Sequence, residues 1–393
     1  MKSIVLVSKD ALCRDYLPTY GNKYWAGKTP NIDVLASKGT VFYNYFTAAP
    51  SSAMSYLSMF TGQYPYQMKM ETYRPLNSQY EGVTVFDKAY DMGYSCHVLW
   101  DEDWISMAKR YSECYGQHTT FHNMKSIEQP VGSHFIHEGF LQPNRNLSEE
   151  TLNRIDQEIC EIMRNEPVFL WIHLPHVING SISYGSDIDI FDRCIGIIRK
   201  YFDDSRIVIT ADHGNMNGNR GKLCYGFDVY NPSIRIPLIT PRKANESAHY
   251  NNVSSVNMFD VLFSSDLPPT HEYIYSDSAY YVQNHRKLAI ISGKYKYIYN
   301  KSSGLEELYD MDYDPNETFS LMEDYIFDVD RKVKSPSREL YFYLDWGYLP
   351  DVRSKMRTEK NRIWVNPTVR QKLMNAGKDL LRPIYDRMTR RKQ

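Results

Sequence analysis

The 393-residue sequence has few cysteines, almost no net charge and no long apolar run. Its six cysteines are scattered without a Cys-x-x-Cys pair, which favours reduced structural thiols over a disulfide framework or a cysteine zinc site. Lys and Arg total 46 against 47 Asp and Glu, so charge gives no argument for nucleic acid as a partner. No apolar stretch approaches the roughly 18 residues of a membrane helix, and the N-terminal apolar run is too short for a signal peptide. We therefore expect a cytoplasmic protein without a membrane span.

What the chain does contain is an alternation of short apolar runs and amphipathic helical segments. Strands are expected at residues 4–7, 41–46, 95–100, 168–174, 206–210 and 234–239, and helices after Thr29-Pro30 and at 83–92, 149–163 and 189–202. Continuous apolar runs are typical of strands buried on both faces of a parallel sheet. Strands alternating with helices predict an α/β fold with a doubly wound, mainly parallel sheet.

The pattern of alternating apolar runs and helical segments ends at about residue 268. Short segments rich in Tyr and Ile follow there, which predict a small antiparallel sheet. Residues 101–146 match neither period and are interpreted as a loop-rich insertion lining the substrate mouth. The predicted organisation is an α/β domain at 1–267, a small C-terminal antiparallel subdomain at 268–325, and a charged, partly helical extension at 326–393.

The stretch 49–65 is the most informative local sequence. A proline and two serines at 50–52 suit the start of a helix, and apolar residues then follow at helical spacing. A hydroxyl at Ser52 would meet backbone N–H groups and the positive end of the helix dipole, which favour an anion. Taken alone, this segment equally fits an ordinary capped core helix.

Polar residues follow the ends of several expected strands. Asp10 follows the first, His173 ends the run at 168–174, and Asp212 and His213 follow the run at 206–210. The carboxyl ends of parallel strands meet at one edge of the sheet, where open α/β sheets bind ligands. Two aspartates and a histidine suit one divalent cation: calcium, manganese, magnesium or zinc. Such a cation would polarise an anionic ester and activate a hydroxyl such as that of Ser52.

Five motifs carry a resemblance to a known family. They are Val-Ser-Lys-Asp-Ala-Leu at 7–12 with Tyr-Gly at 20–21, Thr-Pro-Asn-Ile-Asp at 29–33, Thr-Ala-Asp-His-Gly at 210–214, Tyr-Asn-Pro-Ser-Ile-Arg-Ile-Pro-Leu at 230–238, and Glu-Leu-Tyr-Asp at 307–310 with Asp-Pro-Asn-Glu at 314–317. In their order and wording the chain resembles the sulfatase family of the alkaline phosphatase superfamily, from about Ser3 to Met322. The resemblance implies an alkaline phosphatase-like fold, a metal site at Asp10, Asp212 and His213, and hydrolysis of a sulfate ester.

The resemblance also implies a nucleophile. Counting back nine residues from Thr61 places it at Ser52. In sulfatases this residue is oxidised to formylglycine, whereas in phosphate-handling relatives an unmodified Ser or Thr attacks. Tyr56 stands where the maturation arginine of the family would be. Three functions therefore stay open: a sulfatase with or without formylglycine at Ser52, a phosphomonoesterase, phosphodiesterase or phosphotransferase using unmodified Ser52, and an inactive sulfatase-like binding protein.

The remaining expected site residues also come from the resemblance. His176, in Pro175-His176, is similar to the family histidine that contacts the ester, which implies a role in protonating the leaving oxygen. Tyr225 stands where a cationic residue often contacts substrate. The candidates for substrate binding are His173, Tyr56, Arg220 and Tyr225. The expected substrate is a small-molecule or carbohydrate ester.

Overall fold

The chain consists of two compact units, Met1–Tyr341 and Phe342–Gln393. The computed structural model describes residues 2–24, 26–69, 82–100, 116, 118–124, 149–174, 184–222, 225–278, 286–322 and 348–364, and four short strands between 127 and 146. In the second unit the described structure is one helix, α11 (Leu349–Ile363). The boundaries expected at 267/268 and 325/326 remain predictions. No helix in the described ranges is both long and apolar enough to cross a membrane.

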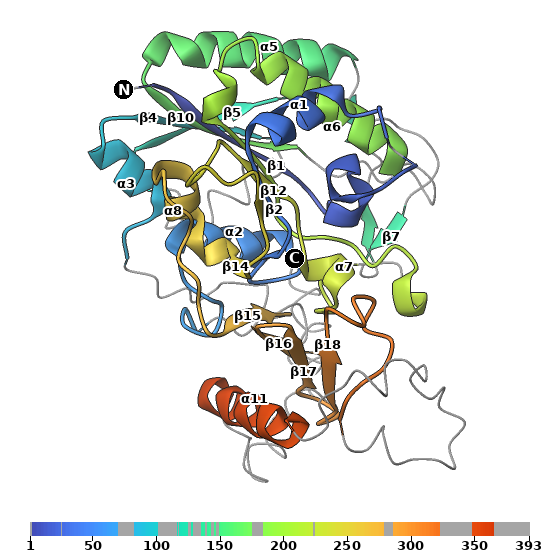
Figure 1. Ribbon diagram of the computed structural model, residues 1–393. Coiled ribbons are helices and arrows are strands. Elements are labelled where there is room, and N and C mark those ends of the chain that lie inside the picture. The colour runs from blue at the N-terminus through green and yellow to red at the C-terminus, as the bar shows by residue number, and fades with distance from the viewer. Residues whose placement is uncertain are drawn as a thin grey trace, which may run out of the picture. The chain divides into compact units, whose positions relative to one another are not determined.

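An eight-stranded sheet forms the centre of the first unit (Figure 1). Its strand order is β13 (Ala248–His249), β2 (Thr40–Phe42), β12 (Leu238–Thr240), β11 (Ile207–Ala211), β1 (Ile4–Lys9), β10 (Val168–Leu174), β4 (Ser95–Trp100) and β5 (Thr119–Asn123). All neighbours pair in parallel except β12, which runs antiparallel to both of its neighbours. The mainly parallel sheet predicted from the apolar runs is confirmed.

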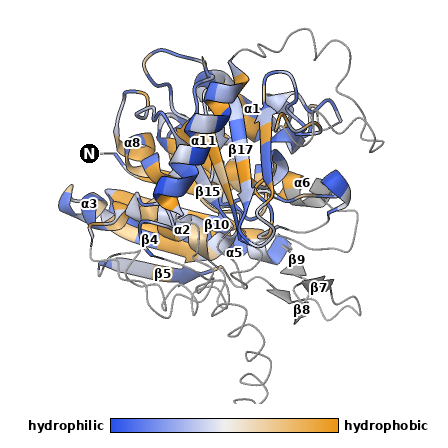
Figure 2. Cartoon of the chain, turned by 90° about the horizontal axis from the view of Figure 1, so that it is seen from below, coloured by the Kyte–Doolittle hydropathy of each residue, from blue (hydrophilic) through white to orange (hydrophobic). Residues whose placement is uncertain are grey.

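Helices cover both faces of this sheet (Figure 1). On one side lie α1 (Pro30–Lys38), α5 (Glu149–Ile162) and α6 (Tyr184–Ile198); on the other lie α2 (Ser52–Thr61), α3 (Val85–Asp91) and α8 (Met258–Phe263). Figure 2 shows the interior strands β4 and β10 in apolar colours and the edge strand β5 in more polar ones. Asp192 of α6 accepts hydrogen bonds from the N–H groups of Asn31 and Ile32, 2.9 Å each, and so caps the start of α1.

Three segments differ from the prediction. The run at 41–46 is divided between β2 and β3 (Tyr45–Phe46), which pairs with β14 (Val253–Ser254) outside the main sheet. The run at 234–239 begins as the last residue of α7 (Asn231–Ile234), because Pro232 suits the first helical turn. Within 101–146, Thr119–Asn123 is an edge strand of the main sheet rather than a loop. This strand was not predicted because its sequence is polar, and an edge strand does not need a continuous apolar run.

Four more short strands lie in the stretch expected to be a loop-rich insertion. They are β6 (Ile127–Glu128), β7 (Phe135–His137), β8 (Phe140–Gln142) and β9 (Arg145–Asn146). β6 pairs with β9, and β7 with β8, both antiparallel.

A separate antiparallel sheet follows the main one in the chain, as predicted. It contains β15 (Ile274–Asp277), β16 (Lys287–Ser292), β17 (Tyr295–Asn300) and β18 (Glu306–Asp310). Ile291 and Tyr309 of this sheet pack with Ile234 of α7 in one buried cluster. This packing places the sheet against the segment that supports the candidate site.

Candidate active site

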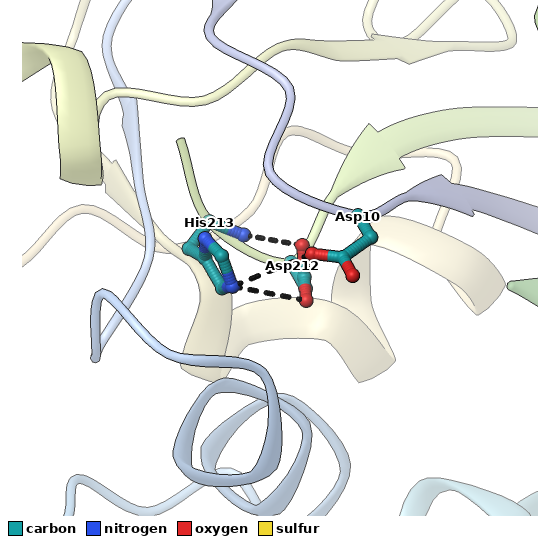
Figure 3. Close-up of side chains that lie close together, drawn as sticks. All are labelled: Asp10, Asp212 and His213. Carbon is teal, nitrogen blue, oxygen red and sulfur yellow. Dashed lines mark hydrogen bonds and ion pairs between the residues drawn. The ribbon is translucent and has the colours of Figure 1, made fainter. Parts of the chain in front are cut away.

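The clearest chemical cluster consists of Asp10, Asp212 and His213 (Figure 3). All three are buried, and one ligand atom from each lies within 4.8 Å of the other two. The Nε2 atom of His213 is 3.6 Å from Asp10 Oδ1 and 3.5 Å from Asp212 Oδ2. The cluster forms because β1 and β11 are paired in parallel, so that the residues following them share one edge of the sheet.

Backbone donors hold the carboxylate of Asp212. Its Oδ1 atom accepts hydrogen bonds from the N–H groups of His213, at 2.7 Å, and of Ala11, at 3.1 Å. Ala11 has a left-handed backbone with φ of 55°. Position 11 therefore contributes its backbone N–H to Asp212.

The tautomer of His213 follows from its neighbours. Its Nδ1 atom lies 2.8 Å from the carbonyl oxygen of Gly214, which can only accept a hydrogen bond. Nδ1 therefore carries a proton, and in the neutral tautomer Nε2 is the nitrogen available to a cation. Two carboxylates and a bare imidazole nitrogen form a donor set that fits a divalent cation.

Gly214 is required by a close approach of two backbones. A Cβ atom at position 214 would lie 1.9 Å from the carbonyl oxygen of Pro232. The N–H of Gly214 donates to the carbonyl oxygen of Ser233, at 2.8 Å. The loop that carries His213 is thus seated on α7.

Ser52 is the first residue of α2, and its N-cap is Ser51. Its Oγ atom lies 3.1 Å from Nε2 of His213. One turn along the helix, Ser55 donates a hydrogen bond to the main-chain oxygen of Asp212, at 2.6 Å, and so ties α2 to the end of β11. The structure therefore brings the serine, the helix N-terminus and the acidic cluster together, as expected from the sequence.

Tyr56 and His173 lie behind Asp212. The hydroxyl of Tyr56 donates to Oδ2 of Asp212, at 2.8 Å, and contacts Nε2 of His173, at 2.7 Å. Burial, together with the charges of Lys9 and His213, lowers the pKa of His173 to about 3, against the opposing effect of Asp212. Burial alone would raise the pKa of Asp212, but His213, His173 and the Tyr56 hydrogen bond outweigh it, so the pKa is lowered. With this low pKa, His173 is neutral near pH 7.

The other expected substrate contacts fall in different places. The ring of Tyr225 packs on His213, with 4.3 Å between centroids. The guanidinium of Arg220 lies over the ring of Tyr230, 4.2 Å from its centroid, and donates to the main-chain oxygen of Glu317. His176 lies outside the described residues. Substrate binding by Tyr56, His173, Tyr225 and Arg220 stays a prediction.

Sequence reasoning missed Ser8 and Trp171. The indole Nε1 of Trp171 donates to Oγ of Ser8, at 2.8 Å, and Ser8 contacts Nδ1 of His173, also at 2.8 Å. Ser8 could have been found from the sequence, because it continues an apolar strand and a buried hydroxyl needs a hydrogen-bond partner.

Comparison with known proteins agrees with this geometry. Residues 2–177 match the family model "Sulfatase". No curated protein matches the sequence. Among solved structures, the chain is similar to a 2-O GAG sulfatase (TM-score 0.64, 15% identity, 92% of each chain covered). It is also similar to the phosphonate monoester hydrolase of Agrobacterium radiobacter (TM-score 0.59, 13% identity, 94% of this chain and 99% of that chain). A third similar structure is in complex with its substrate D-glucosamine-2-N,6-O-disulfate (TM-score 0.59, 14% identity, 92% of this chain and 98% of that chain).

The main sheet and the second antiparallel sheet give this chain the same fold as these sulfatase and phosphonate monoester hydrolase structures. The similarity to the sulfatase family model lies in residues 2–177 of the chain.

Proposed function

We propose that this protein hydrolyses a sulfate ester, with Ser52 as the nucleophile beside one divalent cation held by Asp10, Asp212 and His213. The observation that supports this most is the 3.1 Å between Ser52 Oγ and His213 Nε2, at the edge of the acidic cluster. When bound, the cation would polarise the ester and lower the pKa of a hydroxyl bound to it. The oxidation of Ser52 to formylglycine belongs to this proposal.

The chain's own residues supply the rest of the chemistry. The N-terminus of α2 favours the negative charge of the ester group. Tyr225, whose ring packs on His213, is proposed to contact the ester, and this packing supports the proposal. His176 is proposed to protonate the leaving oxygen. The sulfated sugar bound by one structural relative supports a carbohydrate ester as the substrate.

A phosphate ester attacked by unmodified Ser52 is the second candidate. Tyr56 favours it, because this residue replaces the maturation arginine and its hydroxyl is engaged with Asp212. A phosphonate monoester hydrolase among the structural relatives supports it as well. A phosphomonoesterase, a phosphodiesterase and a phosphotransferase would all fit this chemistry.

Peptide mass and paired substrates distinguish the candidates. The mass of the peptide containing Ser52 reports serine or formylglycine, and 4-nitrophenyl sulfate and 4-nitrophenyl phosphate are assayed with added Mn²⁺ or Ca²⁺. Formylglycine with sulfate cleavage supports the first candidate, whereas serine with phosphate cleavage supports the second. Binding of Mn²⁺ without turnover of either ester would contradict both and favour an inactive binding protein.

Ser52→Ala should abolish turnover in either case. Ser58→Ala is the matched control, since Ser58 lies on the same helix, is also buried, and its hydroxyl has no hydrogen-bond partner among the described residues. This control should retain activity. Equal activity of Ser52→Ala and wild type would show that Ser52 is not the nucleophile.

A further inference from the structure

The ring of Tyr56 is held in an aromatic enclosure beneath α2. Its centroid lies 5.2 Å from that of Trp100, 5.0 Å from that of Trp171 and 6.4 Å from that of Phe60. Only 2% of the residue is exposed. Rings packed in this way cannot change rotamer without opening the core, so the hydroxyl of Tyr56 has a fixed position.

The hydrogen bonds that lead to this hydroxyl have a defined direction. The indole N–H of Trp171 can only donate, and it donates to Oγ of Ser8. Among the described residues, the hydroxyl proton of Ser8 then has one acceptor, Nδ1 of His173 at 2.8 Å. This contact follows from the register of the sheet, in which Ser8 of β1 lies opposite His173 of β10.

The direction continues through the imidazole to the carboxylate. Because Nδ1 of His173 accepts, the proton of the neutral ring is on Nε2, which lies 2.7 Å from the hydroxyl of Tyr56. Tyr56 accepts there and donates its own proton to Oδ2 of Asp212. The opposite tautomer would leave the proton of Ser8 without an acceptor among the described residues, and Nε2 of His173 and Oδ2 of Asp212 would compete for the single proton of Tyr56. Either loss inside a core costs about 1–3 kcal/mol.

We propose that Trp171, Ser8, His173 and Tyr56 are positioning residues that hold the carboxylate of Asp212 in the orientation of a cation ligand. The inference rests on the proposed function only in treating Asp212 as a ligand. Hydrogen bonds behind a ligand fix its orientation, and their loss typically weakens metal affinity 10- to 100-fold. Tyr56 thus acts on the cation site indirectly, through its hydrogen bond to Asp212.

Calorimetric titration of the metal-stripped full chain with Mn²⁺ tests this. Tyr56→Phe should weaken Mn²⁺ binding by about 10- to 100-fold, measured at a temperature at which the metal-free variant remains folded. Tyr45→Phe is the matched control, because Tyr45 is fully buried and its hydroxyl meets no partner in the described part of the chain. Its Mn²⁺ affinity should equal that of wild type.

The outcomes separate this inference from the proposed function. Equal Mn²⁺ affinity of Tyr56→Phe and wild type would overturn the inference while the cation site stands. Failure of wild type itself to bind Mn²⁺ would overturn both.

A second measurement needs no folded variant at position 56. Nitrogen-15 NMR of the histidine rings distinguishes protonated from bare nitrogens, and the spectrum of His173→Gln assigns the signals of His173. The expected result for wild type is a bare Nδ1 and a protonated Nε2. A protonated Nδ1 would refute the direction of the hydrogen-bond chain.

Discussion

The ion pair between Lys296 and Glu317 gives the sharpest stability prediction. Both side chains are fully buried, and Nζ of Lys296 lies 2.5 Å from Oε1 of Glu317. Asn231 of α7 contacts both, since its side-chain oxygen accepts from Lys296, at 3.1 Å, and its N–H donates to Glu317, at 2.6 Å. The pair therefore joins β17 to the helix on which the His213 loop is seated.

Replacing Lys296 by Met leaves the carboxylate of Glu317 buried without its cation. Breaking one partner of such a pair costs about 3–5 kcal/mol of unfolding free energy. This is a large share of a typical stability of about 5–15 kcal/mol. Burial already raises the pKa of Glu317 against the opposing effect of Lys296. Without Lys296 the folded state would bind a proton at Glu317 more readily than the unfolded chain, so the cost of the substitution should shrink as pH falls.

Urea unfolding at pH 7 measures the effect, and an exposed pair provides the control. Lys200 pairs with Asp156 at 2.8 Å, but 57% and 31% of these side chains are exposed, so Lys200→Met should cost about 0–1 kcal/mol. Adding Glu317→Gln to Lys296→Met removes the stranded charge and should recover part of the loss. A cost of Lys296→Met no greater than that of Lys200→Met would refute the reasoning.

Two further predictions concern the site loop and the sheet edge. Gly214→Ala should abolish Mn²⁺ binding, measured by calorimetry, because its Cβ would lie 1.9 Å from Pro232 O; unchanged affinity would contradict the required close approach. Burial and the charge of His122 lower the pKa of His97 to about 4, so the folded state binds fewer protons than the unfolded state between pH 6.5 and 4. Stability present above pH 6.5 should therefore fall in this window, by at most about 3 kcal/mol. His97→Gln should flatten the profile in pH-dependent urea unfolding and exposed His118→Gln should not, and equal profiles would refute this assignment.

Much of the fold was predictable because its signals are local. The apolar runs that became β1, β4 and β10 are buried on both faces, and a strand of that kind needs no polar residue along its length. The edge strand β5 was missed because its sequence is polar. The run at 234–239 was misassigned because Pro232 begins a helix whose last residue overlaps it.

The sequence by itself determined the residue types of the site and their places after particular strands. Asp10, Ser52, Asp212 and His213 could be selected because strand ends and a helix start are encoded within a few residues of each. Their closeness in space depends on the strand order, in which β11 lies beside β1. This pairing brings together residues that are about two hundred positions apart in the sequence.

Only the tertiary structure shows which side chains contact Asp212 and His173 on the side of the core. The contact from Tyr56 to Asp212 and the pairing of Ser8 with His173 depend on the register between strands and on how α2 lies over the sheet. No local pattern encodes these distances, because each joins segments that meet only once the sheet is formed. The direction of the hydrogen bonds follows from the same geometry, since the donor-only indole of Trp171 fixes it from the core side.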